Sequence, residues 1–512
     1  MAPSTLSLNP HYAPKRTLMP VIAAHELSLA EVIAHPFREM IYCGFDSPLT
    51  HEINAAFDRE LPDGGRPLIY DFERALQGPV LEMQLRGFRV DPSARETAIT
   101  NTRRKREAAQ TILDTLAGAV WDKGVNANSG QQLKDLFYNH MGIRPLAMSV
   151  KGERKEPMDR KILERLEDYF YPRPLVNAIL LIRDLDKTLQ VLETEIDSDW
   201  RFRTSYNIGG TDSFRFSSSK SGLGTGGNFQ NVHAELRRIF IPDPGWKLYG
   251  LDKEQAESRE VGFLCGVLFD DWSYLDAAES GDVHTYVTRM VYPEWNWTGD
   301  LRKDRELAEK PFYRTFTYRD ASKRLSHGSN YYGKPPALSQ QIRIPINLVF
   351  QFQERYFSAF PCIRRLHTWV ARELQTKQAL YNVFGVRRDF FDRPDQEETL
   401  RSAIAHLFQS ATAHDTNLGL YRIWKSMRGR VQVLAQLHDA VYFQAREDDD
   451  EEAVVAEATE LMKVELSHRG RKFIVPTEAK SGFNWAPRYR QDADGKWIEW
   501  NKAGLDKIGA KR

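Results

Sequence analysis

Two apolar runs near the C-terminus are separated by only two residues. VQVLAQL occupies 431–437 and AVYFQA occupies 440–445, with His438 and Asp439 between them. Short runs rich in Val, Leu, Phe and Tyr that flank a two-residue break are typical of the two arms of a β-hairpin. The sequence therefore predicts an antiparallel strand pair with an acidic residue at its turn.

A third strand-like run ends on another acid. Residues 201–251 have a strand-like pattern, apart from a Gly/Ser-rich interruption at 217–228, and finish on KLYGLD, which stops at Asp252. An aspartate at the end of a strand is by itself ordinary turn chemistry. Its meaning depends on what surrounds it.

Helical periodicity dominates most of the remaining chain. Residues 79–196 repeat apolar side chains at intervals of three and four, which predicts two long antiparallel helices. Residues 253–400 and 401–424 are also expected to be helical. The acidic run at 447–452 is interpreted as the opening of another helix, where the dipole favours negative charge. The repeating apolar positions in the two long helices are Ala109, Ile112, Leu113, Leu116 and Val120, and Leu175, Ile179, Ile182, Leu185, Leu189 and Leu192.

Composition narrows the class of protein. A chain of 512 residues should fold as several subdomains with separate cores. Its net charge of +1 argues neither for nor against nucleic acid. Three isolated cysteines indicate neither a zinc site nor a disulfide framework, which favours a reducing, intracellular setting. Since no signal peptide and no apolar run of about 20 residues is visible, we expect a soluble, cytoplasmic protein with no membrane partner.

Five segments then occur in one order: RFSSSKSGLGTGGNFQNV (215–232), LYGLDKEQAESRE (248–260), GDVHTY (281–286), YRDASKRLSHGSNYYG (318–333) and QLHDAVYF (436–443). Together they resemble the motifs of family A DNA polymerases, which include bacterial DNA polymerase I and many bacteriophage enzymes. The first palm motif of that family has Asp, then Gln, Glu and Arg at three, five and seven positions later. Asp252, Gln255, Glu257 and Arg259 match it.

The resemblance covers about residues 79 to 487 and implies an α+β, right-hand polymerase fold. Such a fold has an α-helical thumb, a palm built on an antiparallel sheet, and helical fingers. The expected division is an N-terminal segment at 1–78, the thumb at 79–196, the first part of the palm at 197–262, the fingers at 263–400, and the second part of the palm with a C-terminal tail at 401–512. No role is assigned to the tail itself, residues 488–512.

The resemblance implies a template-directed DNA polymerase that uses a two-metal-ion mechanism. Transfer of a nucleotidyl group develops negative charge on both the attacking and the leaving oxygen, and a pair of divalent cations stabilises both. Asp252 and Asp439 are the expected catalytic residues and metal ligands, and a backbone carbonyl near Lys253 is expected to supply a further oxygen. Mg²⁺ is the expected metal, as two ions, with Mn²⁺ as a substitute.

Four residues at intervals of four, Arg319, Lys323, His327 and Tyr331, would share one face of a helix. A solvated stripe is the usual explanation for such charges, but the His and Tyr fit a nucleotide lying along the helix. Arg319 and Lys323 would meet the triphosphate. By similarity, His284 and Gln255 would also contact the nucleotide, Tyr331 would lie beside the templating pair, and Glu257 would exclude a 2′-hydroxyl.

Two positions depart from the family pattern. His327 stands where a Phe or Tyr is usual, so dNTP use is expected but the response to dideoxynucleotides is left open. Ala440 stands where a Glu usually follows the motif aspartate, which removes an auxiliary acid. Asp439 would then carry more of the metal contact, with slower chemistry or an altered metal preference as possible results.

Primer-template DNA is the second expected partner, held without reading its sequence. The resemblance implies contacts from segments in the expected palm, thumb and second palm regions. The match is looser around Gln409, where Ala405 replaces a usual Asn. The basic cluster at 101–107 is more simply explained as a solvated helix face. The expected DNA-binding residues are Arg183, Lys187, Arg215, Asn228, Gln230, Arg401, Gln409 and His438.

The N-terminal segment contains a short pattern, Tyr42 followed by Asp46, that resembles the tail of the last motif of a 3′–5′ exonuclease. No partner acids of the DxE type precede it, so we expect a remnant that does not proofread, with a separate exonuclease subunit as one possible complement. A chance YxxxD match explains the pattern equally well.

Two other functions are compatible with parts of the pattern. A single-subunit RNA polymerase shares a palm with two aspartates, but Glu257 at the sugar position opposes it. A catalytically inactive DNA-binding relative would be expected to have degraded metal ligands, whereas Asp252 and Asp439 are both present. Phage or mobile-element replication, with further replisome partners, is the expected setting.

Overall fold

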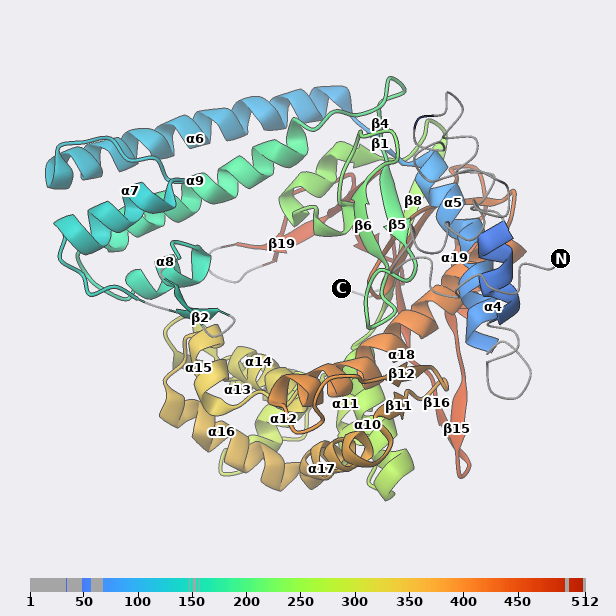
Figure 1. Ribbon diagram of the computed structural model, residues 1–512. Helices are drawn as coiled ribbons and strands as arrows, with labels where there is room; N and C mark the ends of the chain where they lie inside the picture. Colours follow the sequence, from blue (N-terminus) through green and yellow to red (C-terminus); the bar gives the residue numbers. More distant parts are fainter. Residues whose placement is uncertain are drawn as a thin grey trace. The chain divides into compact units, whose positions relative to one another are not determined.

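The structure is a computed structural model that describes residues 34, 48–56, 68–146, 148–150, 153–155, 157–492 and 497–509. The chain divides into two compact units, Met1–Ala75 and Leu76–Arg512. In the first unit, residues 48–56 are helical and α4 spans Leu68–Ala75. The elements described below all belong to the second unit (Figure 1).

A six-stranded sheet holds the strand-like runs found in the sequence. Its strand order is β13 (Val431–Leu437), β14 (Ala440–Arg446), β8 (Trp246–Lys253), β17 (Thr477–Gly482), β21 (Gly504–Lys507) and β18 (Asn484–Pro487). The predicted hairpin is confirmed, since β13 and β14 pair antiparallel with Leu437 opposite Ala440. β8 is antiparallel to β14 on one edge and to β17 on the other. β8 is therefore an interior strand of the sheet, and most of its residues are buried.

Three helices connect the sheet to the rest of the unit. α10 (Ala256–Phe269) follows β8 directly, α18 (Glu397–Ser426) packs against β13 and β14, and α19 (Glu451–Met462) packs against β17. The predicted acidic helix start is confirmed in α19: Asp450 caps it by accepting a hydrogen bond from the Ala453 amide at 3.2 Å, and two glutamates occupy the first turn.

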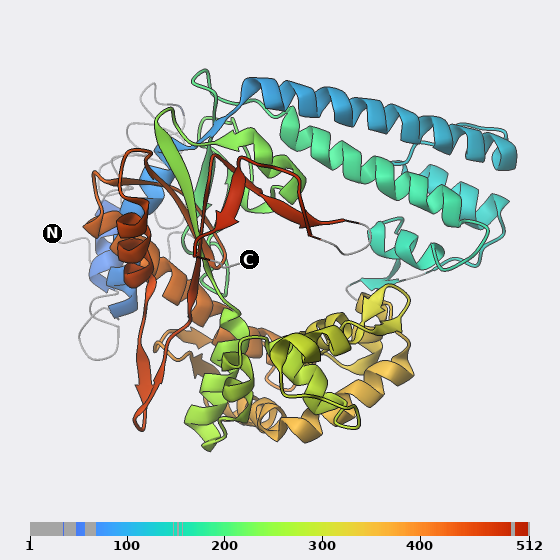
Figure 2. The same ribbon diagram turned by 180° about the vertical axis from the view of Figure 1, so that it is seen from behind.

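The two long helices predicted from periodicity are α6 (Pro92–Trp121) and α9 (Arg173–Leu192), which lie side by side in both views (Figure 1, Figure 2). Arg103 pairs with Glu193 and Arg106 with Asp186, so the helices run antiparallel as predicted. Short elements occupy the connection between them: α7 (Gly130–Lys134), the π-helix η2 (Asp135–His140), β2 (Met148–Val150), β3 (Glu153–Lys155) and α8 (Arg160–Leu166). Apolar residues of α6, α7, η2, α8 and α9 form a core of their own.

The chain between β8 and α18 is mostly helical, as predicted. After α10 come α11 (Ser273–Glu279), α12 (Val283–Val291), α13 (Leu301–Ala308), α14 (Tyr318–Asn330), α15 (Pro335–Ile342), α16 (Ile346–Ala359) and α17 (Pro361–Lys377). Their apolar faces share a second, separate core. Two hairpins that the sequence reasoning did not anticipate interrupt the helices: β9 (Pro311–Tyr313) with β10 (Phe316–Thr317), and β11 (Ala379–Tyr381) with β12 (Arg387–Asp389).

In the region ahead of β8, the structure differs from the sequence prediction at the Gly/Ser-rich segment. The Gly/Ser-rich interruption at 217–228 begins with a strand, since β6 (Ser217–Lys220) pairs antiparallel with β5 (Thr204–Asn207). Backbone pairing, which the serine side chains do not oppose, supplies the order here. The neighbouring elements are α5 (Gln77–Arg86), β1 (Phe88–Val90), β4 (Arg201–Phe202), the 3₁₀-helices η3 (Phe229–Asn231) and η4 (Ala234–Ile239), and β7 (Phe240–Ile241).

The C-terminal tail, to which the sequence assigned no role, contributes to the central sheet. β21 pairs antiparallel with β17 and parallel with β18. The strands β15 (Leu466–His468) and β16 (Arg471–Phe473) form a hairpin, as do β19 (Tyr489–Gln491) and β20 (Trp497–Glu499). The tail is therefore part of the folded unit. The predicted division into five segments stays a prediction.

A polar contact joins the α8 segment to the helices around α14. Arg343, which follows α15, donates to the Glu167 carboxylate at 2.6 Å, to Asp168 at 2.7 Å and to the Glu164 carbonyl at 2.9 Å. Arg314 lies 3.6 Å from Asp168. Figure 1 and Figure 2 both place α8 and α15 at one edge of the space between the α6–α9 pair and the α12–α16 helices.

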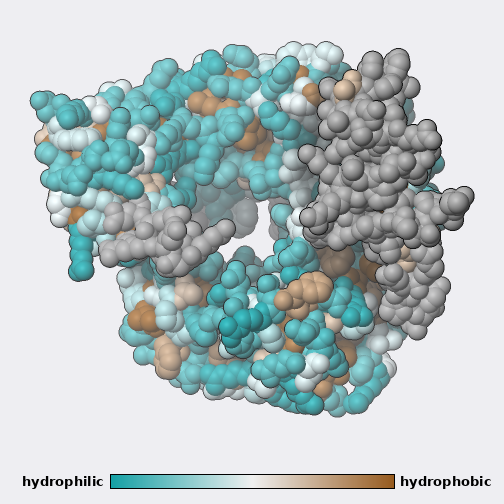
Figure 3. Space-filling view, viewed as in Figure 1, coloured by the Kyte–Doolittle hydropathy of each residue, from teal (hydrophilic) through white to brown (hydrophobic). Residues whose placement is uncertain are grey.

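The surface around that space is largely hydrophilic in the view of Figure 3. Hydrophobic residues are scattered over this face and are not gathered at the opening. No helix within the described ranges is both long enough and apolar enough to cross a bilayer.

Candidate active site

The two predicted catalytic acids lie at the ends of neighbouring strands. Asp252 is the penultimate residue of β8 and stands opposite Ala440, the first residue of β14. The Lys253 amide donates to the Asp439 carbonyl at 3.0 Å, which fixes the β13–β14 turn against the end of β8. His438, in the same turn, has a positive φ of 56°. The fold thus brings Asp252 and Asp439 to one place.

The electrostatics of the pair favour a bound cation. Burial, followed by the charge of Asp439, raises the pKa of Asp252 to about 6. Burial also raises the pKa of Asp439. Two part-buried carboxylates that repel each other are stabilised by a hard divalent ion, and carboxylate oxygens are ligands that Mg²⁺ prefers. Within the described ranges, no cluster of three or more His, Cys, Asp or Glu side chains could hold a metal ion, so the candidate centre consists of this pair and nearby backbone oxygen.

The Lys253 side chain points away from that centre. It is almost wholly buried, and its Nζ lies 2.9 Å from the Asp415 carboxylate and donates to the Met462 carbonyl at 2.6 Å. Burial lowers the pKa of Lys253, and the negative charges of Asp415 and, to a smaller extent, Glu260 oppose that shift. Only the backbone carbonyl of Lys253 is therefore available for the role that the sequence predicted.

Two residues on β17 belong to this site and were missed by the sequence reasoning. Glu478 stands directly opposite Asp252 in the β17–β8 pair. Lys480 Nζ lies 2.7 Å from the Glu478 carboxylate and 3.5 Å from the Asp252 carboxylate, and Lys507 also pairs with Glu478. Alternate residues of a strand share a face, so the spacing of Glu478 and Lys480 was the available signal. Asp252 thus has Ala440 as its neighbour on the β14 side and the acid Glu478 as its neighbour on the β17 side.

Glu257 in α10 joins three of the predicted segments. Its carboxylate accepts hydrogen bonds from Arg215 Nη2 at 2.5 Å and from the Tyr331 hydroxyl at 2.5 Å. His327 Nδ1 lies 3.9 Å away. The predicted sugar-gate residue, one predicted DNA contact and two predicted nucleotide contacts therefore meet at one carboxylate.

The predicted cationic stripe runs along α14, with Tyr331 immediately after the helix ends. Lys323 and His327 are exposed. Arg319 is held instead: Nε and Nη2 donate to the Asp282 carboxylate at 3.0 and 2.9 Å. Asp282 also caps α12 by accepting from two backbone amides. Arg319 is therefore a fixed guanidinium at the start of this stripe, already in a charge-assisted pair.

His284 is on α12 and lies near Arg319 and Lys323 of α14. Burial first, then the charges of Arg319 and Lys323, lowers its pKa to about 4. Its Nδ1 is buried without a hydrogen-bond partner within the described part of the chain. His284 is consequently neutral near pH 7 and acts there as a hydrogen-bonding group, not as a charge. Gln255, the residue before α10, has a positive φ of 54°.

The other predicted DNA contacts divide between local structure and surface. The Ser218 hydroxyl donates to the Asn228 amide oxygen at 2.7 Å and also lies 3.2 Å from the Gln230 amide oxygen, which orders this loop. Arg183 in α9 donates to the carbonyls of Ala127 at 2.7 Å and Met158 at 2.8 Å, so it holds the segments after α6 against α9.

Lys187, Arg401 and Gln409 lie on the two long helices α9 and α18. Lys187 is exposed on α9, one turn beyond Arg183. Arg401 lies on α18 and pairs with Glu397 at 2.9 Å, while Gln409 is half-buried further along the same helix. Tyr42 and Asp46, the predicted exonuclease remnant, lie outside the described residues.

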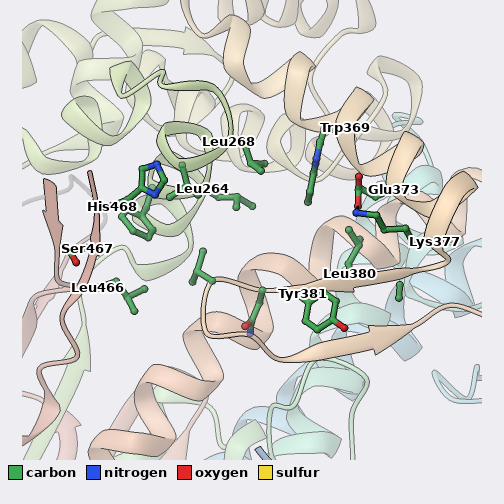
Figure 4. A pocket seen from close by; sticks show the side chains of 15 residues that line it. Leu264, Leu268, Trp369, Glu373, Lys377, Leu380, Tyr381, Leu466, Ser467 and His468 are labelled. Atoms are coloured by element: carbon green, nitrogen blue, oxygen red, sulfur yellow. Dashed lines mark ion pairs between the residues drawn. The ribbon is translucent and has the colours of Figure 1, made fainter. Parts of the chain in front are cut away.

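A cavity of about 490 Å³ lies elsewhere, between α10, α17, β11 and the β15–β16 hairpin (Figure 4). Its lining is mainly apolar, with Leu264, Trp369 and Leu380 among the labelled side chains, and an ion pair between Glu373 and Lys377 at 2.7 Å on its rim. None of the predicted site residues lines it.

Comparison with known proteins identifies the family of the chain. The model of the family described as DNA polymerase family A matches residues 96–487, most of the chain. The chain therefore belongs to DNA polymerase family A. The fold is like that of the POL domain of Pol1 from M. smegmatis, solved in complex with DNA primer-template and dNTP, with a TM-score of 0.65 and 21% identity over 80% of this chain and 69% of that one. The predicted right-hand polymerase fold is confirmed.

Curated relatives are distant but consistent. DNA polymerase I of Chloroflexus aurantiacus is 25% identical over 494 residues, 90% of this chain and 47% of that protein. The thermostable DNA polymerase I of Thermus filiformis is 25% identical over 409 residues, 75% of this chain and 44% of that protein. That of Thermus aquaticus is 25% identical over 420 residues, 77% of this chain and 46% of that protein. The chain spans less than half the length of these relatives.

Proposed function

We propose that the chain is a template-directed DNA polymerase that adds dNTPs to the 3′-hydroxyl of a primer. One observation carries the proposal: Asp252 and Asp439, far apart in sequence, stand at neighbouring strand ends of the sheet in a chain of family A. Two adjacent carboxylates beside a cationic helix face are what nucleotidyl transfer requires of a protein.

Asp252 and Asp439 would hold two Mg²⁺ ions, with the Lys253 carbonyl as a further ligand and Mn²⁺ as a substitute. Bound there, the metal ions stabilise the attacking and leaving oxygens together. The raised pKa of Asp252 supports this assignment, because a carboxylate held in unfavourable surroundings gains most from a cation. Lys480, 3.5 Å from Asp252, supplies positive charge to the same carboxylate.

The nucleotide would lie along α14. Lys323 and the fixed guanidinium of Arg319 orient the triphosphate, and neutral His284 offers a hydrogen bond without adding charge. Glu257 stands beside the sugar, braced by Arg215 and Tyr331, so it excludes a 2′-hydroxyl by position as well as by size. Gln255 and His327 complete the proposed nucleotide contacts.

Primer-template DNA would occupy the hydrophilic space between the α6–α9 pair and the α12–α16 helices (Figure 3). Arg215, His438 and the ordered Asn228–Gln230 loop are the proposed contacts near the primer end. Lys187 and Arg401 are proposed phosphate contacts, and Gln409 a primer-end contact. Arg183 is proposed to act by holding its part of the helix pair in place, with its remaining donor toward DNA.

Primer extension tests the proposal. Purified protein is incubated with a primed template, Mg²⁺ and either dNTPs or rNTPs, and Asp252→Asn is compared with Asp448→Asn, which changes an exposed acid outside the site. We expect dNTP extension by the wild type and by Asp448→Asn, and none by Asp252→Asn. Preference for rNTPs would favour an RNA polymerase, and DNA binding without extension would favour an inactive relative.

The biological setting is proposed more broadly. The long Gly/Ser-rich segment at 217–228, which resembles the phage form of this motif, supports replication of a phage or mobile element in the host cytoplasm. We also propose that a separate exonuclease subunit supplies the proofreading activity. Degradation of a mismatched primer end by this chain alone would contradict the proposal of a separate exonuclease subunit.

A further inference from the structure

The α13 helix contributes to a pocket that the proposed mechanism does not yet use. The pocket has a volume of about 620 Å³ and lies between α12, α13, α14 and the residue before α10. α13 follows α12 in the chain and precedes the β9–β10 hairpin that leads into α14. The polar residues that line the pocket are Gln255, Asp282, Asp300, Arg302, Arg305 and Arg319.

The two acids in this pocket are already satisfied. Asp282 pairs with Arg319 and caps α12. Asp300 caps α13 by accepting from the amides of Arg302 and Lys303, both at 3.0 Å. Among the described residues, neither carboxylate forms an ion pair with the guanidinium of Arg302 or Arg305.

Arg302 and Arg305 are exposed on α13 and have no side-chain hydrogen bond or ion pair within the described ranges. They are three positions apart, so they project from one face of the helix. Gln255 and Arg319 line the same pocket. The pocket thus contains two guanidinium groups that pair with none of the described residues.

The pocket shares two residues with the proposed nucleotide-binding site. Gln255 and Arg319 line the pocket and are also proposed nucleotide contacts. Guanidinium groups bind phosphate oxygens through two parallel hydrogen bonds, which makes a phosphate chain the ligand that these residues fit best. We propose that Arg302 and Arg305 bind the terminal phosphates of the incoming dNTP and the pyrophosphate that remains after transfer, an inference that rests on the proposed function.

In the reaction the primer 3′-hydroxyl gives up its proton to solvent water and its oxygen forms a bond to the α-phosphorus. The bond from that phosphorus to the α,β-bridging oxygen breaks, and pyrophosphate leaves with the electron pair. Arg302 and Arg305 are positioning residues for this leaving group. They determine how tightly triphosphate and pyrophosphate bind, while Asp252 and Asp439 determine whether the transfer occurs.

Single-turnover extension over a range of dNTP concentrations measures the apparent dNTP Kd and the maximal rate separately. Arg302→Ala, Arg305→Ala and the double variant are compared with Lys303→Ala, which removes one charge from the same helix but does not line the pocket. Each arginine variant should weaken dNTP binding and pyrophosphate inhibition about tenfold. Lys303→Ala should leave both unchanged. Equal dNTP and pyrophosphate constants in the double variant and the wild type would overturn the inference.

A second arm separates this inference from the proposed function. Calorimetric titration of the free protein with pyrophosphate needs no primer extension. Pyrophosphate binding that the double variant loses supports the arginine pocket, even if the wild type extends no primer and the polymerase proposal fails. Pyrophosphate binding that both proteins share equally places the anion elsewhere and contradicts the pocket.

Discussion

Glu257 is a hydrogen-bond acceptor for two side chains that come from different parts of the chain. Arg215 precedes β6 and Tyr331 follows α14, yet both donate to its carboxylate at 2.5 Å. Charge-assisted bonds of this length hold a side chain more firmly than neutral ones. The proposed sugar gate is therefore a fixed group, and its position depends on its two donors.

Replacing Glu257 by Ala should relax the preference for dNTPs over rNTPs by about 10- to 100-fold, because the group that would meet a 2′-hydroxyl is removed. Tyr331→Phe removes one donor but keeps the carboxylate, so its effect should be smaller. The ratio of kcat/KM for dATP and ATP in primer extension measures both. If Glu257→Ala leaves that ratio at the wild-type value, Glu257 is not the gate.

For single residues, the sequence predicted which side chains belong to the site better than it predicted the partners that those side chains contact. Asp252 and Asp439 were predictable because strand-like runs end beside each, and the motif spacing adds Gln255 and Glu257. The partners of Lys253 and Arg319 were not predictable: Asp415 and Asp282 come from other helices, and only the fold brings them near. Glu478 and Lys480 were missed because TEAKSG has too few apolar residues to predict a strand.

Helix α18, which packs against the strands that flank Asp439, has buried polar side chains. It spans Glu397–Ser426 and packs against β13 and β14. His406 is fully buried, and its Nε2 is 3.2 Å from the Val386 carbonyl. Burial lowers the pKa of His406 and of His414 to about 4 each. The sequence predicted this helix, but not which of its polar residues face inward.

These histidines predict acid sensitivity. Their folded pKa of about 4 lies below the unfolded value of 6.5, so their contribution to stability is fully present above pH 6.5 and is lost as pH falls toward 4. Each should lower the free energy of unfolding by up to about 1.4 kcal/mol per pH unit in that range. Urea unfolding at pH 7, 6 and 5 measures the slope. His406→Asn should make it shallower, and an unchanged slope would argue against a buried neutral His406.

At the scale of the second unit, Arg343 ties helices separated by much of the chain. It bonds to Glu164 within α8 and to Glu167 and Asp168 just after that helix. Its own backbone ends α15 in the left-handed conformation with φ 61°. An exposed ion pair contributes little alone, but one guanidinium with three acceptors forms a network. This contact closes one edge of the space proposed for DNA.

Removing the tie should loosen the α8 segment without unfolding the helices around α14. Arg343→Ala is expected to speed amide hydrogen exchange at residues 160–168, measured by mass spectrometry. Arg355→Ala, which breaks a pair with Glu294 at 2.7 Å within the α12–α16 helices, serves as the control and should leave that segment unchanged. Identical exchange at 160–168 in Arg343→Ala and the wild type would show that the contact does not hold α8.

The account as a whole depends on Asp252 and Asp439 acting on the same metal ions. Titration with Mn²⁺, followed by electron paramagnetic resonance, measures this for the wild type, Asp252→Asn, Asp439→Asn and the double variant. We predict that each single change weakens Mn²⁺ binding by about tenfold or more, and that the double change adds far less than the sum of the two because the ligands are shared. Wild-type Mn²⁺ binding in either single variant, or fully additive losses in the double variant, would contradict the account.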